Sequence, residues 1–477
     1  MVNPSAIINY ILLFFASFIF LYMILVIVSY GTMLLYALRH LRKDYHLDQE
    51  KEDHDLVELQ FARPVSVIVP AYNEELGIIE SIHSLLSLKY PQYEIIVVND
   101  GSTDRTMEKL LNYFQMEKTE KVFKKQIDTK PVEGIYQSKI HPDLLLIDKV
   151  NGGKADALNI GINASRYPYI CSLDADSILE NSALIRVMKP LLTSNGKVIA
   201  AGGSVKVANG NDIQLGSLMS VSLSDKILVV MQVIEYFRAF LMGRLALSKM
   251  NLSLIISGAF SVFEKKHVIS VGGYDTTAIG EDIELVIKLQ KYVKDSGGKQ
   301  EIQFVPTPVC WTEAPESLHS IRKQRRRWHQ GLLESLWKYR QMTFNPRYGI
   351  IGIVSLPYFW IVECLGPIIE VIGYIFVLGS FFTGSIYVEF SLLLSLLFIL
   401  YGSIFSFTSV IFEAWNTRTY PSIRDLFRLI LLSFTEVFWY RPLTLIWRIE
   451  GIFHFLTQKH DWGHLERKGL ANKEGNT

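Results

Sequence analysis

The chain has 477 residues, of which only 20% are charged and 12% are aromatic, and its 48 Lys and Arg nearly balance its 47 Asp and Glu. So low a charged fraction indicates membrane-spanning segments, and the net charge of +1 gives no reason to expect nucleic acid as a partner. Three cysteines without a CxxC pair exclude a disulfide framework and a cysteine-rich metal site.

An N-terminal membrane anchor is predicted over residues 1–43. Residues 6–30 are almost wholly apolar, which is long enough for one spanning helix, and the first charged residue is Arg39. No basic segment precedes the apolar run, so we expect an uncleaved anchor and not a signal peptide. Because Arg39, Arg42 and Lys43 follow at once, the chain after this span is expected to be cytosolic.

A polar linker is predicted over residues 44–62, followed by a cytosolic domain over residues 63–316. In this domain β-type runs such as 65–69 and 94–98 alternate with helical patterns such as 74–88. The alternation predicts right-handed βαβ units and an α/β fold with a mainly parallel sheet flanked by helices. Ligands of such sheets bind at the carboxyl ends of the strands, where the polar clusters of this chain lie.

Two polar clusters follow the first two predicted strands. Tyr72 and Glu74 come after the first strand and suit a nucleobase, although a helix cap by Asn73 explains the same residues. Asp100 follows the second strand, where its carboxylate can accept hydrogen bonds from a base or a ribose. No GxGxxG segment is present, which argues against a dinucleotide-binding fold.

A glycine turn and a carboxylate pair follow further along the chain. Lys154 comes directly after two glycines and can reach a phosphate, but an ordinary turn fits equally well, and the Walker A spacing is missing. Asp174 and Asp176 follow an apolar strand at positions i and i+2. Such hard oxygen ligands hold Mg²⁺ or Mn²⁺, with substrate phosphates completing the shell. A D-x-D triplet is common by chance, and its place after a buried strand favours the metal site.

A last pair of carboxylates lies at Glu281 and Asp282, and the small residues Ser257 and Gly258 precede them. Adjacent carboxylates at the start of a helix either stabilise its N-terminus or take part in chemistry. In the second interpretation Asp282 is a general base that takes a proton from an incoming hydroxyl.

Amphipathic helices are predicted at the membrane surface over residues 223–263 and again over 317–349. The second of these contains the sequence QRRRW. Gln324, Arg327 and Trp328 there offer a planar donor, a cation and an indole, which suit a sugar ring and a diphosphate. The alternative is a basic flank that only keeps this side of the membrane cytosolic.

Transmembrane and interfacial helices are predicted over residues 350–457, with a cytosolic tail over 458–477. The candidate spans are 350–382, 387–412 and, more weakly, 426–455. Glu363 and Glu370 lie seven residues apart in the first of them. They either line a pathway through the membrane or lie at the level of the headgroups.

These clusters, in this order, resemble the processive family 2 glycosyltransferases of membranes, which include the cellulose, hyaluronan, chitin and poly-N-acetylglucosamine synthases. The similar elements are P-A-Y-N-E, V-N-D-G-S-T-D, G-G-K-A-D-A-L-N, D-A-D, G-E-D and Q-R-R-R-W. The ordered set is specific, whereas any single element is not. The resemblance implies a GT-A type fold and a multi-pass protein of the plasma (inner) membrane with its catalytic domain in the cytosol.

The resemblance also implies a role for each candidate residue. Tyr72, Glu74 and Asp100 would hold uridine, and Lys154 and Asp174 would approach the diphosphate. Asp176, with Asp174, would bind Mg²⁺ or Mn²⁺, Ser257 and Gly258 would contact substrate, and Asp282 with Glu281 would supply the base. Trp328 would line the acceptor end, with Gln324 and Arg327 near the diphosphate.

Two departures from the family pattern narrow the choice of polysaccharide product. The base motif is Gly-Glu-Asp where Thr-Glu-Asp is commoner, and no regulatory nucleotide-binding domain follows the spans, which makes cellulose less favoured. The short architecture with one anchor is most similar to the synthases that use UDP-N-acetylglucosamine. The expected partners are therefore a UDP-sugar donor, a growing polysaccharide and the lipid bilayer, and an accessory export subunit stays open.

Two alternatives remain. A non-processive transferase that adds a single sugar to a lipid carrier would share the donor site, but Trp328 within Q-x-x-R-W argues against it. A membrane scaffold with an inactive catalytic domain is disfavoured because every expected acidic position is occupied.

Overall fold

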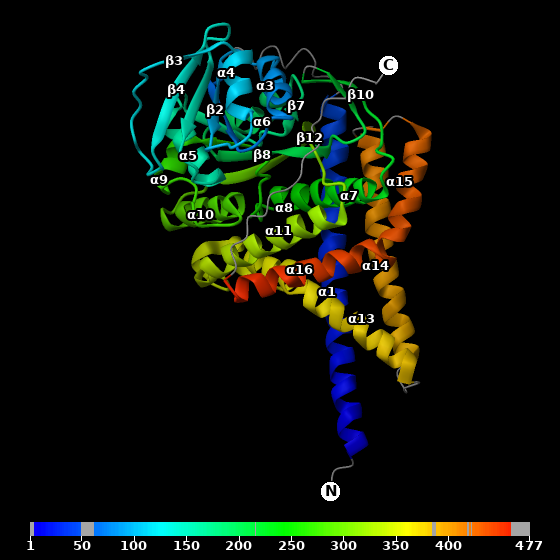
Figure 1. Cartoon of the computed structure of the whole chain (residues 1–477). Helices are drawn as coiled ribbons and strands as arrows, with labels where there is room; N and C mark the ends of the chain where they lie inside the picture. The colour runs from blue at the N-terminus through cyan, green and yellow to red at the C-terminus, as the bar shows by residue number, and fades with distance from the viewer. Residues whose placement is uncertain are drawn as a thin grey trace.

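A ten-stranded mixed sheet forms the centre of the catalytic part of the protein (Figure 1). The computed structural model describes residues 4–48, 62–214, 216–383, 388–416, 419–420 and 422–458. The strands are β1 (Val65–Ala71), β2 (Tyr93–Asn99), β3 (Met116–Lys118), β4 (Val132–Ser138), β5 (Leu144–Lys149), β6 (Tyr169–Leu173), β7 (Ser177–Leu179), β8 (Val198–Val207), β11 (Phe260–Glu264) and β12 (Glu301–Thr312), with β9 (Asp212–Gln214) and β10 (Ser217–Ser220) pairing separately.

The strand order is β3-β4-β5-β2-β1-β6-β11-β8-β12-β7. The four strands β5, β2, β1 and β6 pair in parallel, as do β8 and β12. The pairings of β4, β11 and β7 are antiparallel, so these strands oppose the direction of the others. The predicted mainly parallel α/β sheet is therefore confirmed, with antiparallel insertions.

Both faces of the sheet are buried. Along β1 and β2, Val67 and Ile95 belong to one apolar cluster, and their neighbours Ile68 and Ile96 belong to another. Because successive side chains of a strand point to opposite faces, the two clusters lie on the two sides of the sheet. A sheet covered on both faces exposes its functional groups at the strand ends and in the loops there.

The helices of the catalytic part flank this sheet (Figure 1). They are α3 (Ile78–Leu86), α4 (Thr106–Tyr113), α5 (Lys154–Ala164), α6 (Ala183–Thr193), α7 (Ile227–Phe237), the π-helical segment η2 (Arg238–Arg244), α8 (Leu245–Lys249), α9 (Lys265–Ser270), α10 (Glu281–Asp295) and α11 (Leu318–Lys338). The predicted helices within residues 223–263 are present as α7, η2 and α8. The end of that range is strand β11, which the prediction missed.

The remaining helices belong to the membrane part. They are α1 (Pro4–Asp48), the short 3-10 turns η3 (Arg340–Met342) and η4 (Pro346–Tyr348), η5 (Ile351–Ser355), α12 (Leu356–Tyr358), η6 (Phe359–Cys364), α13 (Gly366–Thr383), α14 (Val388–Asn416), α15 (Ile423–Thr435), η7 (Glu436–Phe438) and α16 (Tyr440–Leu456). Helix α1 runs five residues past the predicted end of the anchor, whereas 49–61 of the predicted linker and 459–477 of the tail lie outside the described residues.

Among the described residues, two helical stretches are long and apolar enough to cross a membrane, Leu13–His40 and Leu392–Trp415. The number rises to as many as four if each of two bent helix pairs counts as one span. These pairs are Ile351–Cys364 with Gly366–Gly379, bent by 41°, and Ile423–Phe438 with Tyr440–Leu456, bent by 54°. In Figure 1, α1, α13 and α14 extend together away from the sheet, while α11 and α16 lie across them next to the catalytic part.

Candidate active site

The loops after β1 and β2 are fastened to each other. Asn73 has a φ of +56°, a conformation that asparagine tolerates better than most residues, and its side-chain oxygen accepts a hydrogen bond from the Thr103 N–H at 2.8 Å. The Asp100 N–H donates to the Ala71 carbonyl at 2.9 Å. Tyr72 stands on this paired loop and is 46% exposed, so its ring is available to a ligand.

Asp100 holds the glycine turn that precedes α5. Its buried carboxylate accepts hydrogen bonds from the N–H groups of Gly152 at 3.0 Å and Gly153 at 2.7 Å. The ammonium of Lys149, at the end of β5, lies 2.5 Å from the same carboxylate and is fully buried. Asp100 therefore fixes the turn that presents Lys154, and its contact with uridine stays a prediction.

Lys154 joins two of the predicted acidic segments. Its ammonium lies 2.6 Å from the Asp174 carboxylate after β6 and 3.0 Å from the Glu281 carboxylate at the start of α10. Desolvation opposes the charge of Lys154, but the two carboxylates outweigh it and raise the pKa of the lysine. A permanently charged lysine therefore lies where segments more than a hundred residues apart in sequence meet.

Asp174 and Asp176 leave β6 through a tight turn, in which the Ser177 N–H donates to the Asp174 carbonyl at 3.0 Å. Among the described residues, no three His, Cys, Asp or Glu side chains are grouped so that they could hold a metal ion. Mg²⁺ and similar ions usually take one or two protein carboxylates together with substrate phosphates. The pair therefore fits a site that is completed by a phosphorylated substrate.

Asp282 lies beside Glu281 in the first turn of α10, and the backbone orients its carboxylate. One oxygen accepts from the Gly258 N–H at 3.0 Å and the other from the Ile283 N–H at 2.9 Å. A Cβ on Gly258 would come within 3.0 Å of that carboxylate, which explains the glycine. Ser257 precedes it and is partly buried. Burial and the Glu281 charge raise the pKa of Asp282, in the direction that suits a general base.

Arg244, at the end of η2, is a partly buried cation that the sequence analysis missed. Its Nη1 atom has no hydrogen-bond partner among the described residues, and its guanidinium carbon lies 4.0 Å from the centre of the Phe240 ring. Burial lowers the pKa of Arg244 to about 10, so the group stays charged at neutral pH, and the nearby Asp282 favours that charge. In return Arg244 opposes the rise in the pKa of Asp282.

Replacing Arg244 by Gln is expected to move the acid limb of the pH profile of kcat/KM to higher pH. In the predicted role of Asp282 as the base, its carboxylate must be deprotonated to act, so activity falls as the pH drops through its pKa, and loss of the guanidinium raises this pKa further. The measurement is the rate of UDP release as a function of pH. A Lys266→Gln variant, at an exposed ion pair with Glu264, is the control. An unshifted acid limb in the Arg244 variant would contradict the assignment of Asp282.

Helix α11 lies directly against the turn that carries Glu281 and Asp282. A Cβ on Gly331 would come within 2.8 Å of the Gly280 backbone nitrogen, so the two backbones touch. Further along, the Lys338 ammonium lies 2.5 Å from the Glu284 carboxylate of α10. The helix predicted within residues 317–349 is present as α11, with Ser317 as its N-cap, and the end of that range forms the 3-10 turns η3 and η4.

The QRRRW residues lie on the first half of α11. Trp328 is 42% exposed, and its ring centre lies 6.5 Å from that of Tyr236 on α7. The Gln324 side-chain oxygen accepts from Arg325, whose guanidinium carbon lies 4.4 Å from the centre of the Trp328 ring. Arg327 is partly buried beside Trp328 in sequence. The segment thus presents the exposed indole of Trp328 with the guanidinium of Arg325 stacked on its ring.

The structure therefore links most of the predicted residues by direct contacts. Asp100 holds the turn before Lys154, which contacts Asp174 and Glu281, and the glycine turn before Glu281 touches α11. Tyr72 and Glu74 lie on the loop after β1, which is hydrogen-bonded to the loop of Asp100. They are therefore connected to the contacts of Lys154 through Asp100. Sequence reasoning missed Lys149, Tyr236 and Arg244. Of these three residues, only Lys149 has a local sequence signal, because it is a lysine at the end of an apolar strand.

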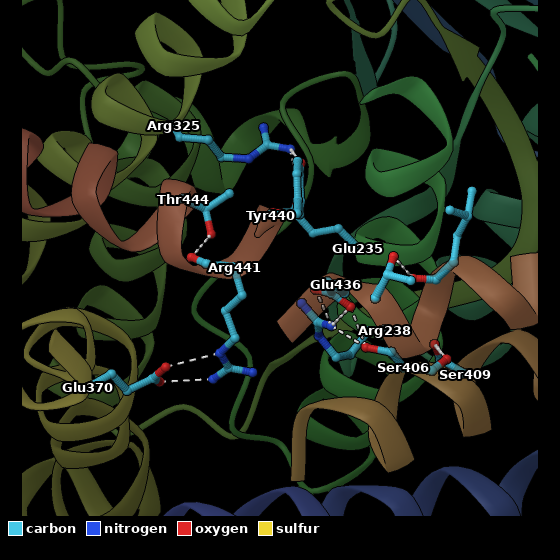
Figure 2. Close-up of polar contacts among 12 residues, drawn as sticks. Glu235, Arg238, Arg325, Glu370, Ser406, Ser409, Glu436, Tyr440, Arg441 and Thr444 are labelled. Atoms are coloured by element: carbon cyan, nitrogen blue, oxygen red, sulfur yellow. Dashed lines mark hydrogen bonds and ion pairs between the residues drawn. The ribbon is translucent and has the colours of Figure 1, made fainter. Parts of the chain in front are cut away.

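One ion pair attaches this site to the membrane helices, and a second joins two of those helices to each other (Figure 2). Arg238 of η2 lies 2.8 Å from Glu436 of η7, and its guanidinium also donates to the Ser406 hydroxyl of α14. Arg441 of α16 binds Glu370 of α13 through two hydrogen bonds, of 3.0 and 2.9 Å. Removing one partner of a buried pair typically costs about 3–5 kcal/mol, so the contact between Arg238 and Glu436 joins η2 firmly to the membrane part.

The two carboxylates considered for a membrane pathway are both engaged in helix packing. Glu370 is held by Arg441, as above. Glu363 accepts a hydrogen bond from the Tyr358 hydroxyl at 2.9 Å and lies 3.5 Å from the guanidinium of Arg448. These contacts account for the two carboxylates within an apolar region, and a membrane pathway is not needed to explain them.

Comparison with known proteins identifies the family. Residues 66–270 match the family model Glycosyl transferase family 2, and residues 169–418 match Glycosyl transferase family group 2. The chain is 31% identical to the poly-β-1,6-N-acetyl-D-glucosamine synthase of Staphylococcus epidermidis over 323 residues, which cover 66% of each protein. It is also 31% identical to the Staphylococcus aureus (strain COL) synthase over 360 residues, 74% of this chain and 73% of that one.

The fold is similar to that of a solved mannosyltransferase from Pyrobaculum calidifontis, in complex with GDP-Man and Mn²⁺. The TM-score is 0.50 at 18% identity, over 93% of this chain and all of that one. This likeness supports the GT-A type fold that the sequence predicted. The family matches and the 31% identity to the staphylococcal synthases show that the chain belongs to the family 2 glycosyltransferases.

Proposed function

We propose that this glycosyltransferase polymerises a UDP-sugar, UDP-N-acetylglucosamine, into a β-linked polysaccharide at the cytosolic face of the plasma (inner) membrane. The observation that carries the proposal is the meeting of Lys154, Asp174 and Glu281, from three distant segments, beside Asp282 and beneath α11. The choice of donor sugar and of a polymeric product is supported by the names of the staphylococcal relatives.

The reaction would be a displacement at C1 of the donor sugar. The acceptor hydroxyl oxygen attacks C1 while Asp282 takes its proton, and the bond between C1 and the diphosphate oxygen breaks as UDP leaves. Attack from the face opposite UDP converts an α-linked donor into a β-linked product. The two backbone N–H groups that bind the Asp282 carboxylate fix its orientation, so that little rearrangement precedes proton transfer.

The charge that develops on UDP needs stabilisation. Mg²⁺ or Mn²⁺ held by Asp174 and Asp176 would neutralise part of it. Lys154 supplies a second, permanent positive charge at the same place, and Arg327 is proposed to add a third. Tyr72, Glu74 and Asp100 are proposed to hold uridine, since their loops adjoin the turn that presents Lys154.

The growing chain would be held at α11. Trp328 offers an exposed flat face, on which sugar rings stack through their apolar sides. Gln324, one helical turn before Trp328, is proposed to lie near the diphosphate at the other end of this acceptor site. Because α11 lies between the catalytic sheet and the membrane helices (Figure 1), a chain held there leaves the site next to the bilayer. The cytosolic orientation of the catalytic domain is proposed from Arg39, Arg42 and Lys43 after the first span.

Replacing Trp328 by Ala is expected to shorten the product while leaving the donor site intact. Loss of one sugar-stacking platform weakens acceptor binding, so chains dissociate after fewer additions. The measurement is the size distribution of product made by purified protein from radiolabelled UDP-N-acetylglucosamine. Trp337→Ala, at an exposed tryptophan on the same helix, is the control and should keep the wild-type distribution.

The same experiment tests the polymer itself. A wild-type product made only of single sugars on a lipid carrier would contradict the proposed polymerase and favour the non-processive alternative.

A further inference from the structure

Arg325 connects the acceptor platform to a buried ion pair. The residue is 3% exposed, although it lies in a segment of five basic side chains. Its Nη2 atom lies 2.6 Å from the Glu235 carboxylate on α7, while its guanidinium carbon lies 4.4 Å from the centre of the Trp328 ring. The other Nη atom donates to Gln324. One guanidinium thus contacts Trp328, which is predicted to line the acceptor end, and Gln324, which is predicted near the diphosphate.

Glu235 has a second partner, which comes from the C-terminal membrane part. The hydroxyl of Tyr440, the first residue of α16, donates to the same carboxylate oxygen at 2.8 Å (both residues are labelled in Figure 2). It also lies 3.5 Å from Arg325 Nη2. Although burial raises the pKa of Glu235, the Arg325 charge outweighs it and lowers that pKa, so the carboxylate is ionised. Hydrogen bonds to a charged acceptor are stronger and more directional than neutral ones.

The first residues of α16 are themselves fixed on their other side. Arg441, next to Tyr440, binds Glu370 of α13 through two hydrogen bonds. Further along, a Cβ on Gly451 would come within 2.7 Å of the Arg326 carbonyl, so α16 and α11 touch at the backbone. The Tyr440 hydroxyl therefore reaches Glu235 from a helix that is held by both the membrane part and α11.

We propose that Tyr440 and Glu235 are positioning residues for the acceptor site. They hold the Arg325 guanidinium in place, and through it the Trp328 ring and the Gln324 amide, so that a β-linked N-acetylglucosamine chain can bind. The C-terminal membrane helix α16 would thereby set how tightly the growing chain is retained. This inference rests on the proposed function, because it concerns the acceptor of that reaction.

If Tyr440 and Glu235 position the acceptor site, removing the Tyr440 hydroxyl should weaken binding of the acceptor and leave binding of the donor unchanged. Tyr440→Phe removes one hydroxyl and keeps the ring. The expected result is an acceptor KM raised about tenfold, the usual scale for a lost hydrogen bond to a charged group. The kcat at saturating acceptor and the dissociation constant of UDP should change little. The full-length purified protein is assayed with UDP-N-acetylglucosamine and a β-1,6-linked N-acetylglucosamine tetramer, and Arg325→Lys should reproduce the effect.

Tyr374→Phe on α13 is the matched control. The Tyr374 hydroxyl is buried without a hydrogen-bond partner among the described residues, and its ring stacks on Phe398, so this variant should behave as wild type.

A double variant separates positioning from a general loss of structure. If Tyr440 acts through Trp328, Tyr440→Phe should have no further effect on the acceptor KM in a Trp328→Ala background. An undiminished effect of Tyr440→Phe in the Trp328→Ala background would overturn the proposed positioning role. A fall in kcat and in UDP affinity, together with a lower melting temperature, would also overturn it. If wild type is active and Tyr440→Phe keeps its acceptor KM, only this inference fails. If wild type releases no UDP with this donor and tetramer, the proposed function fails and the inference with it.

Discussion

Replacing Asp282 by Asn is expected to lower kcat by about 10²- to 10⁴-fold, the usual contribution of a general base, while UDP still binds. Asn keeps the size of the side chain, and its single oxygen can accept one of the two N–H bonds from Gly258 and Ile283. It cannot take the acceptor proton. The measurements are UDP release at saturating donor and acceptor and calorimetric titration with UDP.

Asp295→Asn is the matched control for this variant. Asp295 lies at the opposite end of the same helix, α10, where it pairs with Lys291 at 2.6 Å, so its loss should leave turnover near the wild-type value. Wild-type turnover by the Asp282 variant would show that another group accepts the proton. Loss of UDP binding in that variant would show that Asp282 belongs to the donor site.

Removing the divalent cation is expected to abolish turnover, and Mg²⁺ or Mn²⁺ should restore it. Replacing Asp176 by Asn should lower kcat by about 10²- to 10³-fold at a fixed metal concentration, a typical cost of losing one group that stabilises charge in the transition state. Part of the loss should be recovered at higher metal concentration, because the remaining Asp174 carboxylate and the diphosphate still bind the ion. The measurement is the rate of UDP release against metal concentration.

An exposed carboxylate provides the control for the metal prediction. Asp128 is fully exposed and pairs with Lys125 at 2.9 Å, so Asp128→Asn should keep the wild-type metal dependence. Turnover that is unaffected by a chelator would contradict the role of Asp174 and Asp176.

The central strands could be predicted closely from the sequence. The runs 65–69 and 94–98 predict β1 and β2 to within two residues, since each strand is a continuous apolar run buried on both faces. The helix predicted from Glu74 begins only at Ile78. Asn73 has a positive φ, and the following residues form a turn whose Glu74 N–H donates to Thr106, a contact that local sequence does not reveal.

Strand β11 was missed for a different reason. Its residues Phe260 to Glu264 follow a long apolar stretch, and a short apolar run without alternation does not distinguish a strand from a buried helix. The strand pairs with β6 and β8 between two parallel segments, so its identity depends on tertiary pairing.

The candidate site, like the fold, could be predicted from the sequence only in part. The carboxylates after β2, after β6 and at the start of α10 could be selected because ligands of such sheets bind at the carboxyl ends of the strands and these residue types suit one chemistry. Their partners could not. Glu235 and Tyr440 lie 205 residues apart and meet only in the fold, and Arg244 is one of several basic residues in an amphipathic stretch.

The central claim is that one metal-dependent site transfers a sugar from UDP and keeps the product for the next transfer. It is tested most directly by following UDP release and product size together, with purified full-length protein, UDP-N-acetylglucosamine, Mn²⁺ and the N-acetylglucosamine tetramer. We predict that UDP release equals sugar incorporated, stops on chelation, and yields long chains while most tetramer is unused. Release without incorporation, release that persists without the metal, or one sugar added to every tetramer would contradict this account.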